Sequence, residues 1–199
     1  MKVIAITGGI GSGKSKVSNY LIEKGYPVYF ADDQSKQLLL QDNIRLKIID
    51  LLGPAAYTED DNSYSANKSY IASKIFSDEV LRKEMEAIMH PAVRQDFEDW
   101  LKKQSAEFIF QESALILASK KPYPFDKVIY IDADLDLRIQ GIMKRDQTSR
   151  EQILQRIAAQ PQLEDHISKI DYIINNRFDD SLFDEIDALI EDLKNDNYE

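Results

Sequence analysis

Short, mostly apolar runs alternate with longer segments of mixed polarity along the 199 residues of this chain. The runs cover residues 3–7, 26–30, 108–111, 127–132 and 172–175, and each is bounded by patterns with helical spacing. A strand buried on both faces shows no polar alternation. The runs therefore predict five strands of a buried parallel sheet rather than a half-exposed antiparallel one.

The longer segments predict helices. Apolar residues recur at helical spacing in residues 14–24, 135–145, 149–160 and 181–193, and Gly25 ends the first of these helices. Residues 34–104 contain no convincing strand and predict several further helices, with Pro91 in the first turn of the helix that runs toward Trp100. We therefore expect one domain over residues 1–199: an α/β core with a helical insertion at about 34–104 and a second helical segment at about 138–160.

Composition and charge narrow the class of protein. The chain has 25 Lys and Arg against 35 Asp and Glu, and this net charge of −10 argues against general binding to nucleic acid or to an anionic membrane. The absence of cysteine excludes disulfides and thiolate metal sites. No apolar run approaches the ~20 residues of a membrane helix and no signal peptide is evident, so we expect a cytoplasmic protein. The acidity is local, because residues 179–199 hold nine acidic side chains and one lysine.

The strongest chemical signal is Gly-Gly-Ile-Gly-Ser-Gly-Lys-Ser at residues 8–15, which matches the phosphate-binding pattern G-x-x-x-x-G-K-[ST] in full. It lies between a predicted strand and a predicted helix. Backbone N–H groups and the helix N-terminus favour a bound phosphate, a lysine reaches the terminal phosphates, and the last hydroxyl suits Mg²⁺. The pattern predicts a nucleoside triphosphate site formed by Gly9, Gly11, Ser12, Gly13, Lys14, Ser15 and Lys16, with Ser15 on the metal.

Several kinds of protein use such a loop, and the sequence favours one of them. A GTPase needs N-K-x-D, but residues 67–70 are Asn-Lys-Ser-Tyr. An ATPase acting on nucleic acid needs a strand that ends in Asp-Glu and a basic track, and Gln111-Glu112 is only a weak version of that strand end. A small-molecule kinase fits best. A kinase of a nucleoside or sugar, and a nucleotide-dependent binding protein without catalysis, stay open as alternatives.

A kinase also needs a group that orients the acceptor and a lid over the nucleotide. Asp32 and Asp33 follow the second predicted strand, which we expect beside the strand of the phosphate loop, at the sheet edge where ligands bind. Asp32 then accepts the proton of the acceptor hydroxyl or orients that hydroxyl; alternatively it caps the following helix. In residues 138–160, Arg145 and Arg150 are candidates to meet the charge of the transferred phosphoryl group, and a solvated helix face is the alternative.

Taken in order, these residues resemble the dephospho-CoA kinase family. The resemblance runs from Val3 to about Asn176. It is carried by the phosphate loop, by Ala31-Asp32, by His90-Pro91, by Lys144-Arg145-Asp146 with Arg150 and Gln160, and by the strand that ends in Asn175-Asn176. The family implies a P-loop kinase fold of three layers, in which helices flank a parallel sheet on both faces. It also implies a helical substrate-binding insertion and a helical lid.

The resemblance also implies a reaction and its participants. The γ-phosphoryl group of ATP would pass to the ribose 3′-hydroxyl of dephospho-CoA, with Mg²⁺ present. The catalytic residues would be Asp32, Lys14 and Arg145. Acceptor binding would fall to Asp32 and His90, although His90 is alternatively a helix-end residue before Pro91. The residues that join the loop in binding ATP would be Arg145, Arg150, Asn175 and Asn176, the asparagines near adenine. We expect a monomer or weak homo-oligomer that acts on ATP and dephospho-CoA and not on nucleic acid or membrane.

Four positions depart from the family pattern. Phe30 stands where the family has an Asp before Ala31-Asp32, and Lys16 replaces a common Thr. Leu117 stands where the family usually has a Glu, and Glu112 is an alternative source of that carboxylate five positions earlier. Arg177 stands where the family frequently has a Gly. The departures concern the metal shell and the adenine end of the site.

Overall fold

The computed structural model describes residues 1–60, 63–117, 123–160, 163 and 166–195. Its internal contacts divide the chain into two compact units. The first consists of Met1–Phe30 and Gln104–Glu199, and the second is Ala31–Lys103. Each unit has its own apolar core, so each is described by itself.

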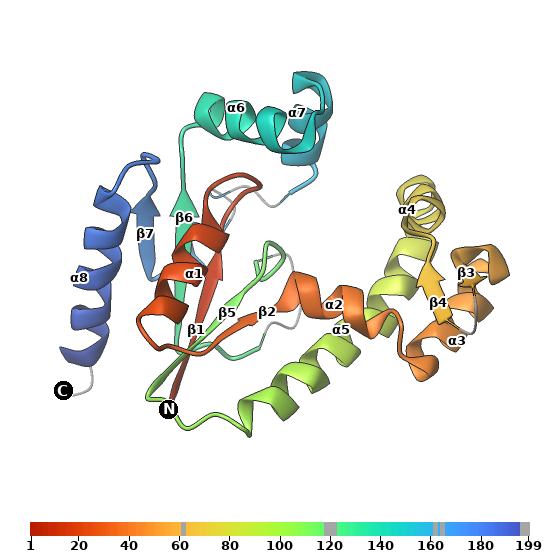
Figure 1. Cartoon of the computed structure of the whole chain (residues 1–199), viewed down its shortest axis with the longest axis horizontal. Coiled ribbons are helices and arrows are strands. Elements are labelled where there is room, and N and C mark those ends of the chain that lie inside the picture. The colour runs from red at the N-terminus through yellow and green to blue at the C-terminus, as the bar shows by residue number, and fades with distance from the viewer. Residues whose placement is uncertain (61–62, 118–122, 161–162, 164–165, 196–199) are drawn as a thin grey trace. The chain divides into compact units, whose positions relative to one another are not determined.

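A five-stranded parallel sheet forms the centre of the first unit (Figure 1). Its strands are β1 (Lys2–Thr7), β2 (Val28–Phe30), β5 (Phe108–Glu112), β6 (Lys127–Asp132) and β7 (Tyr172–Asn175). The five predicted strands and their parallel pairing are confirmed. The second strand is shorter than predicted and starts after Pro27, which has no N–H for the ladder; the Pro27 carbonyl instead accepts a hydrogen bond from Phe110 N.

The order of the strands is β2-β5-β1-β6-β7, so the expectation that β2 lies beside β1 is wrong. β5 lies between them, with Ile6 of β1 opposite Glu112 and Glu112 opposite Phe30 of β2. The second strand also ends at Phe30 rather than in Ala31-Asp32-Asp33, which is already helical. Backbone pairing uses groups that every strand carries, so an apolar run in the sequence predicts a strand but not its neighbour.

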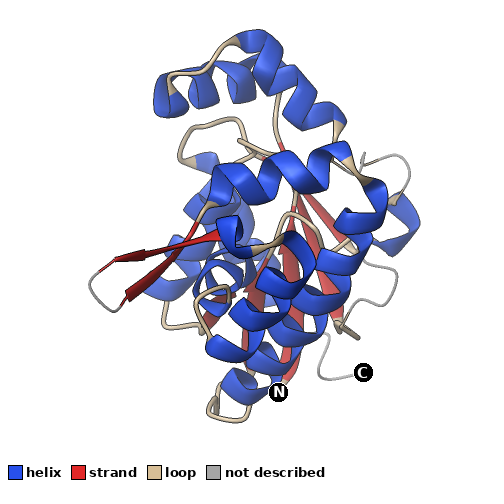
Figure 2. Ribbon diagram, turned by 90° about the vertical axis from the view of Figure 1, so that its right-hand side faces the viewer, coloured by secondary structure: helices blue, strands red, loops and turns tan. Residues whose placement is uncertain are grey.

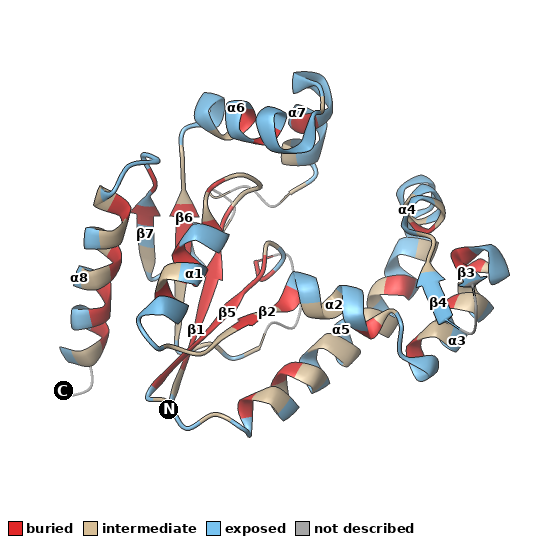
Figure 3. Ribbon diagram, viewed as in Figure 1, coloured by how far each residue is buried: buried red, intermediate tan, exposed pale blue. Residues whose placement is uncertain are grey.

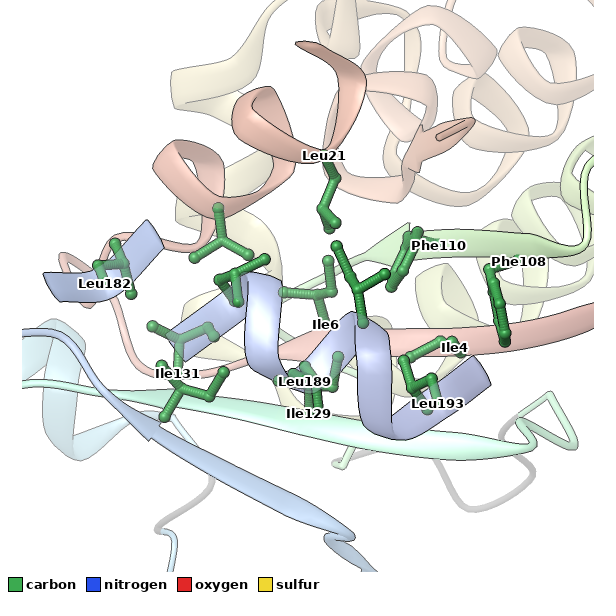
Figure 4. Close-up of a cluster of buried hydrophobic side chains, with 14 residues drawn as sticks. Ile4, Ile6, Leu21, Phe108, Phe110, Ile129, Ile131, Leu182, Leu189 and Leu193 are labelled. Carbon is green, nitrogen blue, oxygen red and sulfur yellow. The ribbon is translucent and has the colours of Figure 1, made fainter. Parts of the chain in front are cut away.

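Helices α1 (Lys14–Glu23) and α8 (Ser181–Asn195) bury one face of the sheet (Figure 4). Ile4 and Ile6 of β1 lie in one cluster with Leu21 of α1 and Leu189 of α8. Figure 3 shows that the buried positions of α8 follow one side of the helix, which leaves its acidic side chains on the exposed side. The predicted helices at 14–24 and 181–193 are confirmed within two residues at each end.

Charged and aromatic groups join α1 to α8 at the surface. Asp187 of α8 accepts hydrogen bonds from Tyr20 Oη at 2.8 Å and Lys24 Nζ at 2.9 Å. The hydrogen bonds of Lys24 and Tyr20 hold the pKa of Asp187 below its ordinary value, and those with Tyr20 and Asp187 raise the pKa of Lys24. Because these groups face water, they orient the helix ends more than they stabilise the fold.

Helices α6 (Leu135–Asp146) and α7 (Arg150–Ala158) follow β6 and form a helical pair, as the sequence predicts. Asp134 and Ser149 accept hydrogen bonds from the first backbone N–H groups of the two helices and so fix where each begins. Gln147, in the left-handed conformation, ends α6. The pair has a small core of its own, made by Ile139, Ile142 and Ile153 with Ile157 and Ile10.

The second unit contains α2 (Ala31–Leu38), α3 (Asp42–Leu52), a 3₁₀ turn at Pro54–Ala56, β3 (Tyr57–Asp60), β4 (Ser63–Ala66), α4 (Lys68–Ser77) and α5 (Glu79–Leu101). Its core collects apolar side chains from α3, α4 and α5, among them Ile48, Ile71 and Met85. Within the described residues no helix of either unit is long and apolar enough to cross a membrane.

Two expectations for this unit are wrong. It is not wholly helical, because β3 and β4 pair as an antiparallel ribbon, with Thr58 opposite Ser65 (Figure 2). The strands escape the sequence pattern because most of their residues are polar and β4 is largely exposed. Pro91 is not at a helix start either: it lies inside α5, which begins at Glu79 after the cap Asp78. Pro91 has no N–H to donate to the carbonyl of Ala87, which is an exposed residue four positions earlier in the helix.

Leu21 and Ile22 are neighbours on α1 that test the core directly. Leu21 is 1% exposed and Ile22 is 46% exposed. Leu21→Ala is expected to lower the free energy of unfolding by about 2–5 kcal/mol, because it leaves a cavity between α1 and the sheet. Ile22→Ala is expected to change it by less than about 0.5 kcal/mol. Urea unfolding of both variants measures this, and equal losses would contradict the packing described for α1.

Candidate active site

The phosphate loop runs from β1 to α1 and takes a conformation that glycine permits. Gly11 and Gly13 have φ of 78° and 97°, in the left-handed region. A Cβ on Gly13 would lie 2.2 Å from Nδ2 of Asn176, and one on Gly11 would lie 2.8 Å from Cδ1 of Ile142. These positions therefore need glycine both for the backbone turn and for the close approach of neighbouring elements.

Lys14 is held inside the loop. It is 9% exposed, and its Nζ donates to the carbonyls of Gly8 at 2.8 Å and Gly9 at 3.1 Å. A buried ammonium with carbonyl partners keeps its charge close to the loop backbone, where a phosphate would sit.

The N-terminus of α1 presents donors toward the same loop. Gly13 is its N-cap and supplies no side-chain hydrogen bond, so the first N–H groups of α1 lack the side-chain cap that most helices carry. The Ser12 hydroxyl is buried and has no hydrogen-bond partner among the described residues. N–H groups at a helix start and an unpartnered hydroxyl are the features of an anion site.

Glu112 brings a carboxylate to the loop from the end of β5. It is 8% exposed, and its Oε1 accepts a hydrogen bond from Ser15 Oγ at 3.2 Å. Its Oε2 is buried and has no hydrogen-bond partner among the described residues. An unpartnered buried carboxylate oxygen is costly unless a cation or donor joins it. The sequence indicated Glu112 as a weak strand-end carboxylate and as an earlier carboxylate in place of the family's Glu at position 117, and the structure places it against Ser15 of the loop.

Asn176 ties the chain after β7 to the loop. It is 2% exposed; its Nδ2 donates to Ser12 O at 2.8 Å, and its Oδ1 accepts from Phe178 N at 2.8 Å. Both polar atoms of this amide therefore act within the protein. Asn175 is exposed and pairs with Asp132 in the sheet. The adenine contact of the two asparagines stays a prediction.

The arginines of the α6–α7 pair have different partners. Arg145 donates to Asp146 at 2.7 Å and Arg150 to Asp136 at 3.0 Å, and both arginines are exposed. Hydrogen bonding with Asp146 raises the pKa of Arg145, and Arg145 in turn lowers the pKa of Asp146. Arg138, in the first turn and a half of α6, instead donates from Nε to the carbonyl of Ile10 in the loop, at 2.9 Å.

The remaining predicted residues lie apart from the loop interior or in the second unit. Lys16 is exposed; its Nζ lies 3.4 Å from Asp179 O and 4.7 Å from the ring centre of Phe183. Asp32 lies in the first turn of α2 rather than at its cap, where the helix dipole favours a carboxylate. His90 is exposed in the middle of α5, so the alternative that made it a helix-end residue is wrong.

Comparison with known proteins decides the family. The family model described as CoaE: Dephospho-CoA kinase matches residues 2–181, which include the loop, Glu112, Arg138 and Asn176. The chain belongs to the dephospho-CoA kinase family.

Relatives agree with this membership. The dephospho-CoA kinase of Bacteroides fragilis strain YCH46 is 34% identical over 189 residues, which cover 94% of this chain and 90% of the relative. The crystal structure of the Thermus thermophilus protein TT1252 superposes with a TM-score of 0.83 at 27% identity and covers 96% of this chain and 97% of its own. The dephospho-CoA kinase of Campylobacter jejuni shares the fold, with a TM-score of 0.61 at 22% identity and 96% coverage of both chains.

Sequence reasoning named Glu112 as a carboxylate and Gln160 as part of the lid segment, but it did not predict that they and Arg138 contact the loop. Arg138 follows the end of β6 by one helical turn, Gln160 follows α7, and Glu112 ends β5. The available signal was position: the carboxyl ends of neighbouring parallel strands meet at one sheet edge, so polar residues just after any strand are candidates. The order of the strands was needed to choose among them.

Asn176→Ala tests the tie between β7 and the loop. The variant leaves the buried carbonyl of Ser12 and the N–H of Phe178 without their partners, so we expect the free energy of unfolding to fall by about 1–3 kcal/mol. Asn175→Ala is the matched control and is expected to change it by less than about 0.5 kcal/mol. Urea unfolding of the two variants decides, and a similar loss in both would remove the special role assigned to Asn176.

Proposed function

We propose that this kinase transfers the γ-phosphoryl group of ATP to the ribose 3′-hydroxyl of dephospho-CoA, giving CoA and ADP. The observation that carries the proposal is the loop constellation: buried Lys14, the uncapped start of α1 and the Ser15–Glu112 pair, in a chain of the dephospho-CoA kinase family. Phosphoryl transfer needs positioning and charge stabilisation more than covalent chemistry, and these groups supply both.

Each loop group has a part in holding the triphosphate. The N–H groups at the start of α1 donate to phosphate oxygens. Lys14 Nζ gives up its hydrogen bonds to the carbonyls of Gly8 and Gly9 and donates to the terminal phosphates instead. Arg145 lies on the last turn of α6 within the segment 138–160, which acts as the lid and excludes water from the transferred group. Its guanidinium, now bonded to Asp146, then meets charge on the γ-phosphoryl group.

The residues present fit Mg²⁺. Ser15 Oγ and Glu112 Oε1 lie 3.2 Å apart, and Glu112 Oε2 has no hydrogen-bond partner among the described residues. Ser15 and Glu112 would hold the ion together with phosphate oxygens, since Mg²⁺ commonly takes one or two protein ligands and completes its shell with phosphates and water. When bound, the ion would neutralise part of the negative charge of the phosphates. No group of three or more acidic or histidine side chains gathers into a metal site within the described residues, which agrees with a site completed by the nucleotide.

Asp32 is the proposed acceptor-side residue. Its chain position supports this role, because it comes two residues after β2 ends at Phe30, and Phe30 is paired with Glu112 in the sheet. A carboxylate there accepts the hydroxyl proton or orients the hydroxyl for attack on the γ-phosphorus. The second unit, Ala31–Lys103, which includes His90, would hold the rest of the CoA-like acceptor.

Release of ADP in the presence of ATP, Mg²⁺ and dephospho-CoA tests the function. We expect turnover with dephospho-CoA well above the ATP-only control, with CoA as the second product. Nucleosides and sugars serve as competing acceptors in parallel assays. Turnover of one of these in preference to dephospho-CoA would replace the proposed acceptor, and no turnover with any acceptor would indicate a nucleotide-binding protein.

Asp32→Asn tests the acceptor-side role. The expected result is a fall in kcat of about 10²–10⁴-fold, the range of general-base contributions, with ADP affinity retained. Asp33→Asn is the matched control, because Asp33 lies in the same helical turn and pairs with exposed Lys36 at 2.6 Å. Steady-state kinetics on both variants measure this. A near-wild-type kcat in Asp32→Asn, or an equal loss in Asp33→Asn, would refute the assignment.

A further inference from the structure

Ile10, between two glycines of the phosphate loop, is held on both of its peptide groups by residues of the α6–α7 segment. Its N–H donates to Gln160 Oε1 at 2.7 Å, and its carbonyl accepts from Arg138 Nε at 2.9 Å. Arg138 belongs to α6, and Gln160 lies just after α7, where its own N–H donates to Ile157 O. One loop residue thus forms hydrogen bonds with residues at both ends of a helical pair that lies more than 120 residues away in the sequence.

The side chain of Ile10 continues the same contact. It packs against the small core of Ile139, Ile142 and Ile153 inside the helical pair. The α6 helix also meets the loop on either side of Ile10: a Cβ on Gly9 would lie 2.3 Å from Nη2 of Arg138, and one on Gly11 would lie 2.8 Å from Ile142. The loop is therefore a partner of the helical pair as well as a phosphate site.

These contacts have a consequence for nucleotide binding. The N–H and carbonyl of Ile10 are used within the protein, so they fix the two peptide planes that precede the phosphate-facing residues 11–15. A glycine-rich loop that is free before binding loses conformational entropy when it closes on phosphate, and this loss weakens binding. A loop already held in place by Arg138 and Gln160 loses less.

We propose that Arg138 and Gln160 are positioning residues, which pre-organise the phosphate loop through Ile10 and thereby couple nucleotide binding to the order of the α6–α7 segment. The inference rests on the proposed function only in requiring a nucleotide in the loop. The acceptor has no part in it, so ADP binding measured without acceptor tests it even if dephospho-CoA is not the acceptor.

Gln160 allows a matched set of variants. Gln160→Leu removes the acceptor of the Ile10 N–H, Gln160→Glu keeps an acceptor oxygen, and Gln155→Leu makes the same change at an exposed position of α7. Hydrogen exchange at residue 10 in the free protein is expected to be slow in wild type, Gln160→Glu and Gln155→Leu, and fast in Gln160→Leu. Calorimetry is expected to show about tenfold weaker ADP binding in Gln160→Leu, the effect of one net hydrogen bond, and unchanged binding in Gln155→Leu.

The outcomes separate positioning from a general structural role. Wild-type exchange and ADP affinity in Gln160→Leu would overturn the proposal, and so would equal effects in Gln155→Leu or fast exchange in Gln160→Glu. Thermal unfolding of every variant verifies that it folds. Arg138→Met then supplies a second, independent removal at the Ile10 carbonyl if Gln160→Leu does not fold.

Arg138 needs one further comparison, because a guanidinium beside the loop is also able to bind phosphate directly. If both residues act through Ile10, the second removal costs less once the first has freed the loop. The double variant Arg138→Met/Gln160→Leu is therefore expected to lose less ADP affinity than the product of the single losses. If the fold-loss of ADP affinity in the double variant equals the product of the two single fold-losses, Arg138 binds phosphate directly, and its positioning role is overturned.

Ile10→Ala tests the coupling through the side chain. In wild type, saturating ADP is expected to slow hydrogen exchange in α7, because a filled loop holds Ile10 against the isoleucine core of the helical pair. In Ile10→Ala, saturating ADP is expected to give at most half of that protection. Equal protection in the two proteins would overturn the coupling.

Discussion

The pairing of β1 between β5 and β6 is the constraint on which the rest of the site depends. Because all three strands are parallel, their carboxyl ends meet at one edge of the sheet. The phosphate loop follows β1, Glu112 ends β5, and α6 with Arg138 follows β6. A single backbone arrangement therefore brings a cation, a carboxylate and a guanidinium to one glycine-rich loop.

Buried polar groups then determine the details of the loop. Lys14 bonds to loop carbonyls, Asn176 bonds to the Ser12 carbonyl, and Ser15 bonds to Glu112. Each bond satisfies a group that would be costly to bury alone. Two buried side-chain atoms of the site, Ser12 Oγ and Glu112 Oε2, have no hydrogen-bond partner among the described residues, and a phosphate and a cation would join them.

The net charge of −10 is compatible with such a site because the acidity is concentrated elsewhere. The exposed side of α8 carries much of it, while the opposite side packs Leu182, Ile186 and Leu189 against the sheet. An amphipathic helix separates the two requirements: its apolar side stabilises the core, and its charged side faces water. The phosphate loop lies at the carboxyl edge of the sheet, where Lys14 and Arg138 supply positive charge.

The sequence by itself determined the loop, the five strands and the helices of the first unit, because each is a local pattern of residue types. The resemblance to the family came from the order of several such patterns between Val3 and Asn176. The sequence placed Lys14 and Ser15 where the turn after β1 becomes a helix, as the structure has them, but it placed β2 beside β1 and overlooked the polar β3–β4 ribbon, which has no apolar periodicity. Only the tertiary structure decided that Glu112, Arg138, Gln160 and Asn176 contact the loop. These contacts join residues between 97 and 164 positions apart, and the order of the strands, which no local pattern encodes, brings them together.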